Sequence, residues 1–443
     1  EAEKFCVCVC LEINNLNIRS PLPRMTGSSA AKLNTIYEWK YIDYTWDSEA
    51  DRAAAIKSGE YNKTKPIVID VDVWRNRKVF VTLVRGEGVP ASLTTVSNKF
   101  GDGGPLLQPY PDWSWARRGD CNEITNVYRV AIDECDRLWV MDNGQIGGVQ
   151  ICQPQLLAFD LKTDDLLTRV KIPNSISQNS ETKIGMLITP IVETAGYKCK
   201  RTHVYIADVT GHALVVWNGE SLWRLQSPVF SPQASATNVE IAGESFDLDD
   251  GVLGMALSPR RNGQSRFLMF RPFASLDMNY AETSNLQNSY NGGVVTYSVA
   301  SRALSSPAVA MAFSSQGVLF FALTKETALA CWNMDKSISR ENIVSATFFP
   351  RNRETIQFAS GLKVIQTHIT GGSEQIWMVT NRYQKMANGT QNFDEVNFRI
   401  MAGYVEDLIA GTKCDPKPML ASNYYWNYRD SSSSRLFNNN RQR

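Results

Sequence analysis

A strand-rich unit recurs six times along the chain, and this repetition restricts the possible folds more than any other feature. Each unit has an apolar strand, a short polar turn, a second strand of almost continuous apolar residues, and a third strand after a Gly- or Asn-containing loop. The second strands are KVFVTL from Lys78, RLWVMD from Arg137, HVYIAD from His203, RFLMFRP from Arg266, VLFFAL from Val318 and QIWMVT from Gln375. The third strands are ASLTTV, QLLAFDL, ALVVWN, GGVVTYS, TALACWN and FRIMAGY. Such a period, without helical periodicity between the copies, predicts an array of antiparallel sheets.

Six sheets in an open row would expose two apolar end faces, and closing the row into a ring removes both. We therefore predict an all-β fold, a six-bladed β-propeller. Closure needs a strand from one end of the chain to complete a blade made by the other end. The segment YEWKYIDYTW, residues 37–46, precedes the first unit, and we predict that it supplies the outer strand of the last blade. Two stacked β-sandwiches are the alternative, which the evenness of the repeats disfavours.

The two ends of the chain differ from the repeats. Residues 1–30 hold a short apolar run behind Lys4 and then a polar stretch with Pro21 and Pro23, which is typical of a signal-peptide remnant and a loose leader. A buried first strand is the alternative interpretation. Residues 31–415 are predicted to form the propeller domain, and residues 416–443, rich in Asn, Ser and Arg, a disordered tail.

Charge and composition narrow the range of partners. The chain has 46 basic and 45 acidic residues, so no strong field predicts binding to nucleic acid or to an anionic membrane. No stretch approaches the ~20 apolar residues of a membrane span. Two glycosylation sequons begin at Asn62 and Asn388, and they fit a secreted, extracellular glycoprotein.

The cysteines inside the predicted propeller are even in number, which favours disulfides in a secreted chain. Blade strands alternate in direction, so the turns that join first to second strands all lie on one face of the disc. Cys135 and Cys199 meet on that face across adjacent blades, whereas the remaining cysteines of the second blade lie on the opposite face. The predicted disulfides are Cys121–Cys152, Cys135–Cys199 and Cys331–Cys414. With three histidines and no CxxC or HExxH motif, we predict no metal site, no Cys-His nucleophile and no cofactor.

Six motifs are distributed along the chain between Tyr37 and Asp415. They are GVPASLTTV from Gly88, IDECDRLWVMDNG from Ile132, QLLAFDLKTD from Gln155, DDGVLGMALSP from Asp249, ACWN from Ala330 and IAGTKCD from Ile409. Together they resemble the insect yellow and major royal jelly protein family, more closely its yellow branch. The resemblance implies a secreted six-bladed propeller. It also implies one of several roles: cuticle melanisation, dopachrome conversion, or binding of biogenic amines such as serotonin.

A ligand site is expected at the mouth of the central channel, where inner strands begin and second-to-third loops converge. The resemblance to the amine-binding members implies a hydroxyl residue, an amide and aromatic rings at this mouth, and Tyr128 would line the same place. Such a slot suits a catecholamine or an indoleamine. This chain adds Arg382, whose charge favours a carboxylate-bearing ligand such as dopachrome. The predicted ligand-binding residues are Phe358, Ser360, Asn381, Arg382, Tyr383 and Tyr128.

For each of these residues a purely structural role is the alternative. Tyr128 and Tyr383 can serve in packing, and Asn381 can satisfy a turn. As an enzyme, the protein would convert dopachrome, with Arg382 holding the carboxylate and Tyr128 or Glu123 moving the proton, although no specific acid-base motif is present. The acidic stretch from Glu244 to Gly251 fails the spacing of a calcium loop and is interpreted as a solvated loop.

The resulting prediction is a secreted yellow-family protein of the pigmentation pathway that binds a small aromatic ligand. Dopachrome conversion is one alternative. A biogenic-amine-binding or structural protein of the cuticle or royal-jelly type, without catalysis, is the other.

Overall fold

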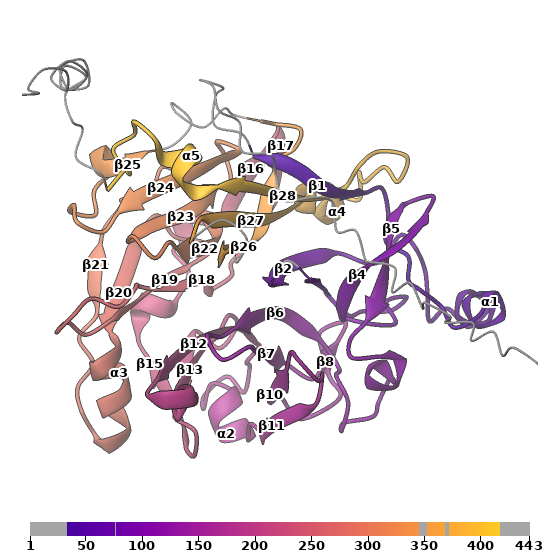
Figure 1. The fold of residues 1–443 in the computed structure, drawn as a ribbon, viewed down its shortest axis with the longest axis horizontal. Helices are drawn as coiled ribbons and strands as arrows, with labels where there is room; N and C mark the ends of the chain where they lie inside the picture. The colour runs from indigo at the N-terminus through magenta and orange to yellow at the C-terminus, as the bar shows by residue number, and fades with distance from the viewer. Residues whose placement is uncertain (1–32, 76, 345–351, 368–371, 417–443) are drawn as a thin grey trace, which may run out of the picture.

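The computed structural model of the chain describes residues 33–416 except 76, 345–351 and 368–371. Within these residues, six four-stranded antiparallel sheets surround a common axis (Figure 1). The predicted β-propeller is confirmed. The predicted leader, residues 1–30, and most of the predicted tail, residues 416–443, lie outside the described residues.

The first strand of each blade lies at the axis and contacts the first strands of both neighbouring blades. These inner strands are β2 (Val68–Trp74), β6 (Val127–Ile132), β12 (Leu187–Ala195), β18 (Val252–Leu257), β22 (Ala308–Phe313) and β26 (Phe358–Gln366). The second strands are β3 (Lys78–Leu83), β7 (Arg137–Asp142), β13 (Arg201–Asp208), β19 (Phe267–Pro272), β23 (Val318–Leu323) and β27 (Glu374–Asn381). All six predicted second strands are therefore confirmed.

The third strands are β4 (Leu93–Gly101), β10 (Gln155–Asp160), β14 (Ala213–Trp217), β20 (Met278–Glu282), β24 (Ala328–Asn333) and β28 (Phe398–Tyr404). The prediction was wrong for the fourth blade, where GGVVTYS is not the third strand. Most of that segment follows helix α3 (Thr283–Asn288) as an irregular stretch, with Val294 88% exposed, and only its last residue enters an outer strand. The true third strand, MNYAE, is too polar to stand out as an apolar run.

The outer strands are β5 (Gly104–Pro109), β11 (Leu166–Lys171), β15 (Leu222–Gln226), β21 (Ser298–Ala300), β25 (Ile343–Val344) and, for the sixth blade, β1 (Asn34–Trp39). β1 pairs antiparallel with β28, so the two ends of the propeller domain meet in one sheet (Figure 1). Closure by an N-terminal strand is confirmed, but its predicted bounds, residues 37–46, were wrong. The chain leaves the sixth blade after Trp39, and Tyr44 bridges to Leu107 on the outer strand of the first blade.

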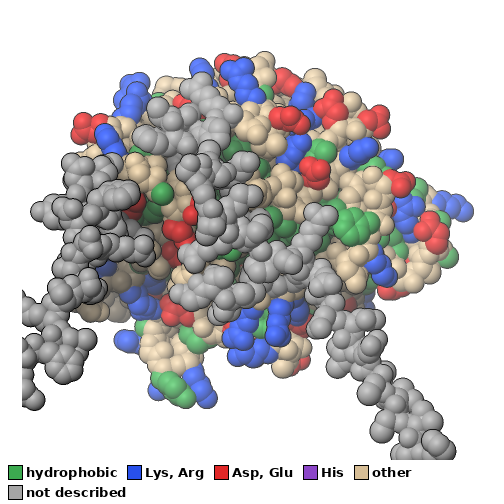
Figure 2. Space-filling view, turned by 45° about the horizontal axis from the view of Figure 1, so that its top comes forward, with side chains coloured by type: hydrophobic (Ala, Val, Ile, Leu, Met, Phe, Trp, Pro, Cys, Tyr) green, Lys and Arg blue, Asp and Glu red, His purple; other side chains and the backbone are tan. Residues whose placement is uncertain are grey.

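Apolar side chains fill the spaces between neighbouring blades. Trp139 of the second blade, fully buried, packs against Trp217 of the third with ring centroids 5.5 Å apart. Burial of one such large side chain contributes roughly 1.5–3 kcal/mol. On the face shown in Figure 2, basic and acidic side chains are interspersed.

The inner strands are held together by buried polar groups because their inner edges carry unpaired N–H groups. Asp70 accepts from the N–H of Val130 at 3.2 Å and Asp72 from that of Ile132 at 3.2 Å, which links the first blade to the second. Lys363 of the sixth blade forms an ion pair with Asp70 at 2.7 Å. Burial raises the pKa of Asp72 to about 7.

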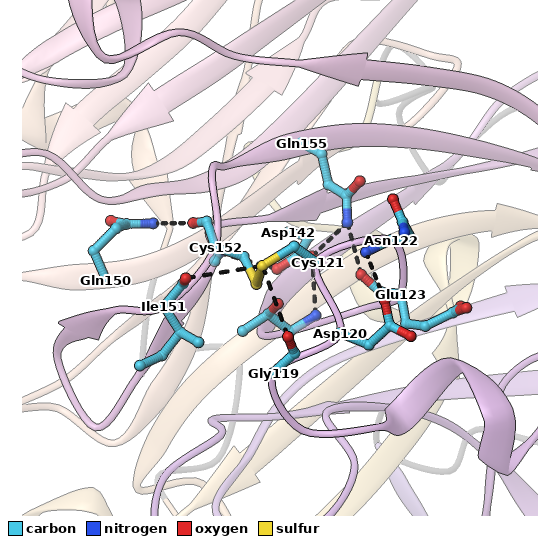
Figure 3. Close-up of a disulfide and its surroundings, with 12 residues drawn as sticks. Gly119, Asp120, Cys121, Asn122, Glu123, Asp142, Gln150, Ile151, Cys152 and Gln155 are labelled. Atoms are coloured by element: carbon cyan, nitrogen blue, oxygen red, sulfur yellow. Dashed lines mark hydrogen bonds between the residues drawn. A yellow bond between two sulfur atoms is a disulfide. The ribbon is translucent and has the colours of Figure 1, made fainter.

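The three disulfides of the structure are the three predicted pairs. Cys121–Cys152 closes a loop of the second blade (Figure 3), Cys135–Cys199 joins the second blade to the third, and Cys331–Cys414 ties the segment after α5 (Val405–Ile409) to β24. Each is expected to stabilise the fold by ~2–4 kcal/mol, mainly through restriction of the unfolded chain.

We call the face on which the inner strands begin the front face. The loops from second to third strands and the connections between blades also lie there, because strand direction alternates within each blade. The front face carries α1 (Glu49–Ser58), α2 (Asn174–Ser177), α4 (Tyr383–Ala387) and two small hairpins, β8–β9 (Gln145–Ile146, Val149–Gln150) and β16–β17 (Asn238–Ile241, Glu244–Asp247).

Candidate functional site at the channel mouth

The aromatic residues predicted for the ligand site meet at the front mouth of the channel. Tyr128 is the second residue of β6, Phe358 begins β26 and Tyr383 begins α4. The rings of Phe358 and Tyr383 are stacked, with centroids 4.9 Å apart and planes 24° from parallel. Tyr128 and Tyr383 belong to the same apolar cluster as Phe358. The structure therefore brings together three aromatic residues that are far apart in the sequence.

Ser360 and Asn381 lie beneath these rings and are almost completely buried, with 1% and 2% of their surface exposed. The Asn381 amide donates to the Ser360 hydroxyl at 3.2 Å and to the Val68 carbonyl at 2.9 Å, and it accepts from the Tyr383 N–H at 3.0 Å. These contacts satisfy the turn into α4 and join the sixth blade to the first. Asn381 thereby fixes the backbone at Tyr383, and it pairs with Phe358 across the strands of the sixth blade.

The hairpin β16–β17 covers this mouth, which the sequence reasoning missed. Its apolar residues Val239, Ile241 and Phe246 are buried in the cluster of Phe358, and the Phe246 ring lies 5.4 Å from that of Tyr383. The stretch from Glu244 to Gly251, interpreted as a solvated loop, therefore contributes a strand of this cover. That interpretation was wrong because it considered only the acidic residues. Phe246 and Leu248 alternate with them, and such alternation is typical of a half-buried strand.

Polar contacts fasten the tip of the hairpin to α4 and the loop after it. Glu244 forms an ion pair with Lys385 at 2.7 Å and accepts from the Thr390 hydroxyl at 2.7 Å. Asn388, the exposed sequon residue, donates to the Ser245 carbonyl at 3.2 Å. The Lys385 and Thr390 bonds hold the pKa of Glu244 below its usual value. We call these contacts the latch. The other sequon residue, Asn62, is exposed and accepts from the Thr64 N–H at 3.0 Å.

Asp250 supplies a negative charge at the mouth. Burial, and then the neighbouring charge of Asp249, raises the pKa of Asp250 to about 6, while Arg129 opposes this rise. Burial, followed by the charge of Asp250, raises the pKa of Tyr128 to about 12 and also raises that of Tyr383. The carboxylate is thus within electrostatic reach of both phenols.

Among the described residues, no hydrogen bond or ion pair joins the Asp250 carboxylate or either phenol group to another side chain. The Asp250 carboxylate and the hydroxyls of Tyr128 and Tyr383 therefore have unused hydrogen-bonding capacity, and the carboxylate acts electrostatically on both phenols. The sequence analysis missed Asp250 because it compared this acidic stretch only with the spacing of a calcium-binding loop. The signal that could have found it is its position, directly before the start of an inner strand.

Arg129 lies below this group on the axis and is 4% exposed. Its guanidinium donates to Thr189 Oγ1 at 3.1 Å, to the Leu253 carbonyl at 3.4 Å and to the Ser360 carbonyl at 2.7 Å. These acceptors come from three other blades, so Arg129 connects four blades at the floor of the mouth. Burial lowers its pKa, although Asp70 and Asp250 counteract this effect.

The two remaining predicted residues already have charged partners. The Arg382 guanidinium is bonded to the Glu395 carboxylate, which offsets the positive charge on which the sequence-based argument for a carboxylate ligand rests. Glu123 lies in the loop before β6, where Arg117 pairs with it at 3.2 Å. Neither residue contributes an uncompensated charge to the mouth.

The fold and the site together define a β-propeller whose front mouth is lined by aromatic rings and covered by a hairpin, and whose Asp250 carboxylate has no side-chain partner in the part of the chain that the structure describes. Comparison with known proteins identifies the family to which this propeller belongs. The family model described as Major royal jelly protein matches residues 125–414. The chain belongs to this family, as its motifs predicted.

Curated relatives agree with this assignment. Major royal jelly protein 9 of Apis mellifera is 46% identical over 387 residues, which cover 86% of this chain and 89% of that protein. Major royal jelly protein 6 of Apis mellifera is 39% identical over 419 residues, which cover 92% of this chain and 94% of that protein. Both are royal jelly proteins, so the yellow branch stays a prediction. A solved gluconolactonase of Xanthomonas campestris, at 9% identity and a TM-score of 0.42, is too distant to bear on function.

Proposed function

We propose that this protein is a secreted member of its family that binds a small aromatic amine at the front mouth of the propeller, beneath the hairpin β16–β17. The observation that carries the proposal is the aromatic cluster of Phe358, Tyr383 and Tyr128 at the front mouth. The Asp250 carboxylate, which has no side-chain partner among the described residues, acts electrostatically on both phenols and raises their pKa. A buried carboxylate is stabilised by a cation, and a protonated amine supplies one. The aromatic rings offer a stacking surface for the rest of the ligand.

Two further features support this ligand class. Tyr128 and Tyr383 present hydroxyls that can bond to the phenol groups of a catechol or a hydroxyindole. Arg382, whose charge would repel an amine, is offset by Glu395. Secretion has separate support, since the three disulfides fit an oxidising compartment. Among the described residues, no helix is long and apolar enough to cross a membrane. A catecholamine ligand would connect the protein to the pigmentation pathway predicted from its sequence.

Dopachrome conversion is the second candidate. A carboxylate with a pKa of about 6 is in the range that suits a general base near neutral pH, and Asp250 has that value. The same negative charge disfavours the carboxylate of dopachrome. Incubation with dopachrome, followed by its visible absorbance, distinguishes the two: we expect no acceleration of its decay over buffer, and turnover that Asp250→Asn abolishes would favour the enzyme.

We expect amine binding to weaken below about pH 6. The ligand stays protonated throughout this range, but the Asp250 carboxylate gains a proton as the pH falls through its pKa of about 6. Affinity should therefore be constant above about pH 7 and fall by roughly tenfold per pH unit well below pH 6. Calorimetric titration with dopamine and serotonin between pH 4.5 and 8 checks this dependence. An affinity that does not change across this range would exclude Asp250 as the counter-ion.

The cover must open for a ligand to enter, because Phe246 lies against the rings that would hold it. Glu244→Ala removes the ion pair with Lys385 and the bond from Thr390, so the association and dissociation rates should both rise, by about tenfold. Stability should change by less than ~1 kcal/mol because the latch is partly exposed. Stopped-flow fluorescence measures the rates. Glu240→Ala, at an exposed position on the same hairpin with no side-chain partner among the described residues, is the matched control. Equal rates in both variants would contradict the latch.

A further inference from the structure

A cavity opens on the front face between the first two blades. Its volume is about 710 Å³, within the range of sites for small organic molecules. Tyr128 forms part of its wall, so it adjoins the amine site, but Asp250, Phe358 and Tyr383 are not among its lining residues. The described contacts leave this cavity without an assigned role.

The charges around this cavity are predominantly positive. Lys65 and Arg118 are exposed at its rim, and among the described residues neither side chain forms a hydrogen bond or an ion pair. Arg85 lies deeper, only 2% exposed, and its guanidinium donates to the carbonyls of Ile124 and Thr125 but forms no ion pair with a residue that the structure describes. Three cations therefore line the cavity against a single carboxylate, that of Glu87. Burial, and to a smaller extent Arg118, lowers the pKa of Arg85.

The other wall is apolar. The hairpin β8–β9 and the residue after it carry Val149 and Ile151, which are 62% and 44% exposed although both line the cavity. Ile146 and Met186 extend this surface inward. Large apolar side chains exposed beside a cavity mark a surface that a ligand can cover. The cavity thus has one cationic side and one apolar side.

The two sides are fixed relative to each other. Cys121, three residues after Arg118, is disulfide-bonded to Cys152, which follows Ile151 (Figure 3). The hairpin tip is tied across the cavity by a bond from the Gly147 N–H to the Arg85 carbonyl at 3.2 Å. Gly147 and Gly148 both have positive φ, at 57° and 82°, which lets the hairpin turn tightly toward Arg85. This arrangement is preorganised and does not have to fold around a ligand.

We propose that this cavity is a second ligand site, selective for an amphipathic organic anion, whose carboxylate lies between Lys65 and Arg118 and whose hydrocarbon part covers Val149 and Ile151. A cation would be repelled by the three basic groups, and a fully polar anion would leave the apolar wall in water. A medium-chain fatty acid and an apolar aromatic acid share the required chemistry. The site is independent of the proposed amine site apart from their common wall at Tyr128.

The test uses three probes with the same chain length: decanoate, decylammonium and decanol. Calorimetry on the full-length protein should show binding of decanoate, weaker binding of decanol and none of decylammonium, with an affinity for decanoate that falls as salt is raised. Lys65→Ala combined with Arg118→Ala should weaken decanoate binding by about tenfold or more. Both residues are exposed, so folding should be unaffected, and Lys99→Ala, which removes an exposed lysine elsewhere, is the control.

Three results would overturn this proposal: no binding of decanoate, equal binding of decylammonium, or an unchanged affinity in the double variant. Val149→Asp gives an independent check, because a charge on the exposed apolar wall should reduce decanoate binding without disturbing the core. Asp250→Asn separates the two sites. It should leave decanoate binding unchanged, and tighter binding of decanoate in that variant would show that the probe occupies the amine site, because the substitution removes a carboxylate that repels an anion there.

Discussion

Deletion of β1, Asn34–Trp39, should prevent the protein from accumulating in folded form. The strand pairs along β28, and its loss would leave an open edge on the sixth blade. Trp39 is 1% exposed, and its indole N–H donates to the Pro105 carbonyl at 2.6 Å, which links the sixth blade to the first. Loss of a buried Trp side chain alone costs roughly 3–5 kcal/mol, a large part of the stability of a typical domain.

Secretion yield and thermal unfolding measure the loss of stability caused by the deletion. Two substitutions in the same strand provide the comparison. Trp39→Ala keeps the backbone pairing but removes the buried side chain, so it should be strongly destabilising yet less so than the deletion. Thr35→Ala changes an exposed position in the same strand and should be close to neutral. A deletion variant that is secreted and unfolds at the parental temperature would contradict closure of the ring by β1.

The propeller could be predicted from the sequence because its central strands are buried on both faces. RLWVMD and VLFFAL became β7 and β23 with the predicted starting residues. The fourth blade shows the limit of predicting strands from apolar runs. Its third strand, MNYAE, contains Asn279 and Glu282, and α3 separates it from the outer strand, so apolarity alone selected the wrong segment. The closing strand was misplaced because Trp39 and Tyr44, both buried, serve different blades.

The disulfides followed from topology, since alternating strand direction fixes the face on which each turn lies. The candidate site was only partly predictable. Phe358, Tyr383 and Tyr128 were expected at the mouth and lie together there. The covering hairpin and Asp250 come from a connection between the third and fourth blades, more than a hundred residues from Tyr383. No local sequence pattern indicates such a contact, because it forms only when the ring closes.

Asp250→Asn should weaken amine binding more than any other single substitution at the mouth. The change removes the negative charge but keeps the size of the side chain, so the fold should be preserved. A charge-assisted hydrogen bond contributes ~1.5–3 kcal/mol, which corresponds to a loss of affinity of roughly ten- to a hundredfold. Stability at neutral pH should hold or rise slightly, because burial of the charged form is unfavourable, as its raised pKa indicates.

Two matched variants test whether the loss of amine affinity is specific to Asp250. Asp249→Asn removes the adjacent but exposed charge and should change the affinity by less than about threefold. Arg382→Ala leaves Asp250 untouched and should not weaken an amine. If the ligand is instead a carboxylate held by Arg382, that variant would lose binding and Asp250→Asn would gain it.

The most direct test is therefore a calorimetric titration of dopamine and serotonin into the parent protein, Asp250→Asn, Asp249→Asn and Arg382→Ala at pH 7.5. We expect binding in the parent, the ten- to hundredfold loss in Asp250→Asn alone, and near-parental affinity in the other two variants. Absence of amine binding in the parent, or an equal affinity in Asp250→Asn, would contradict the proposed site.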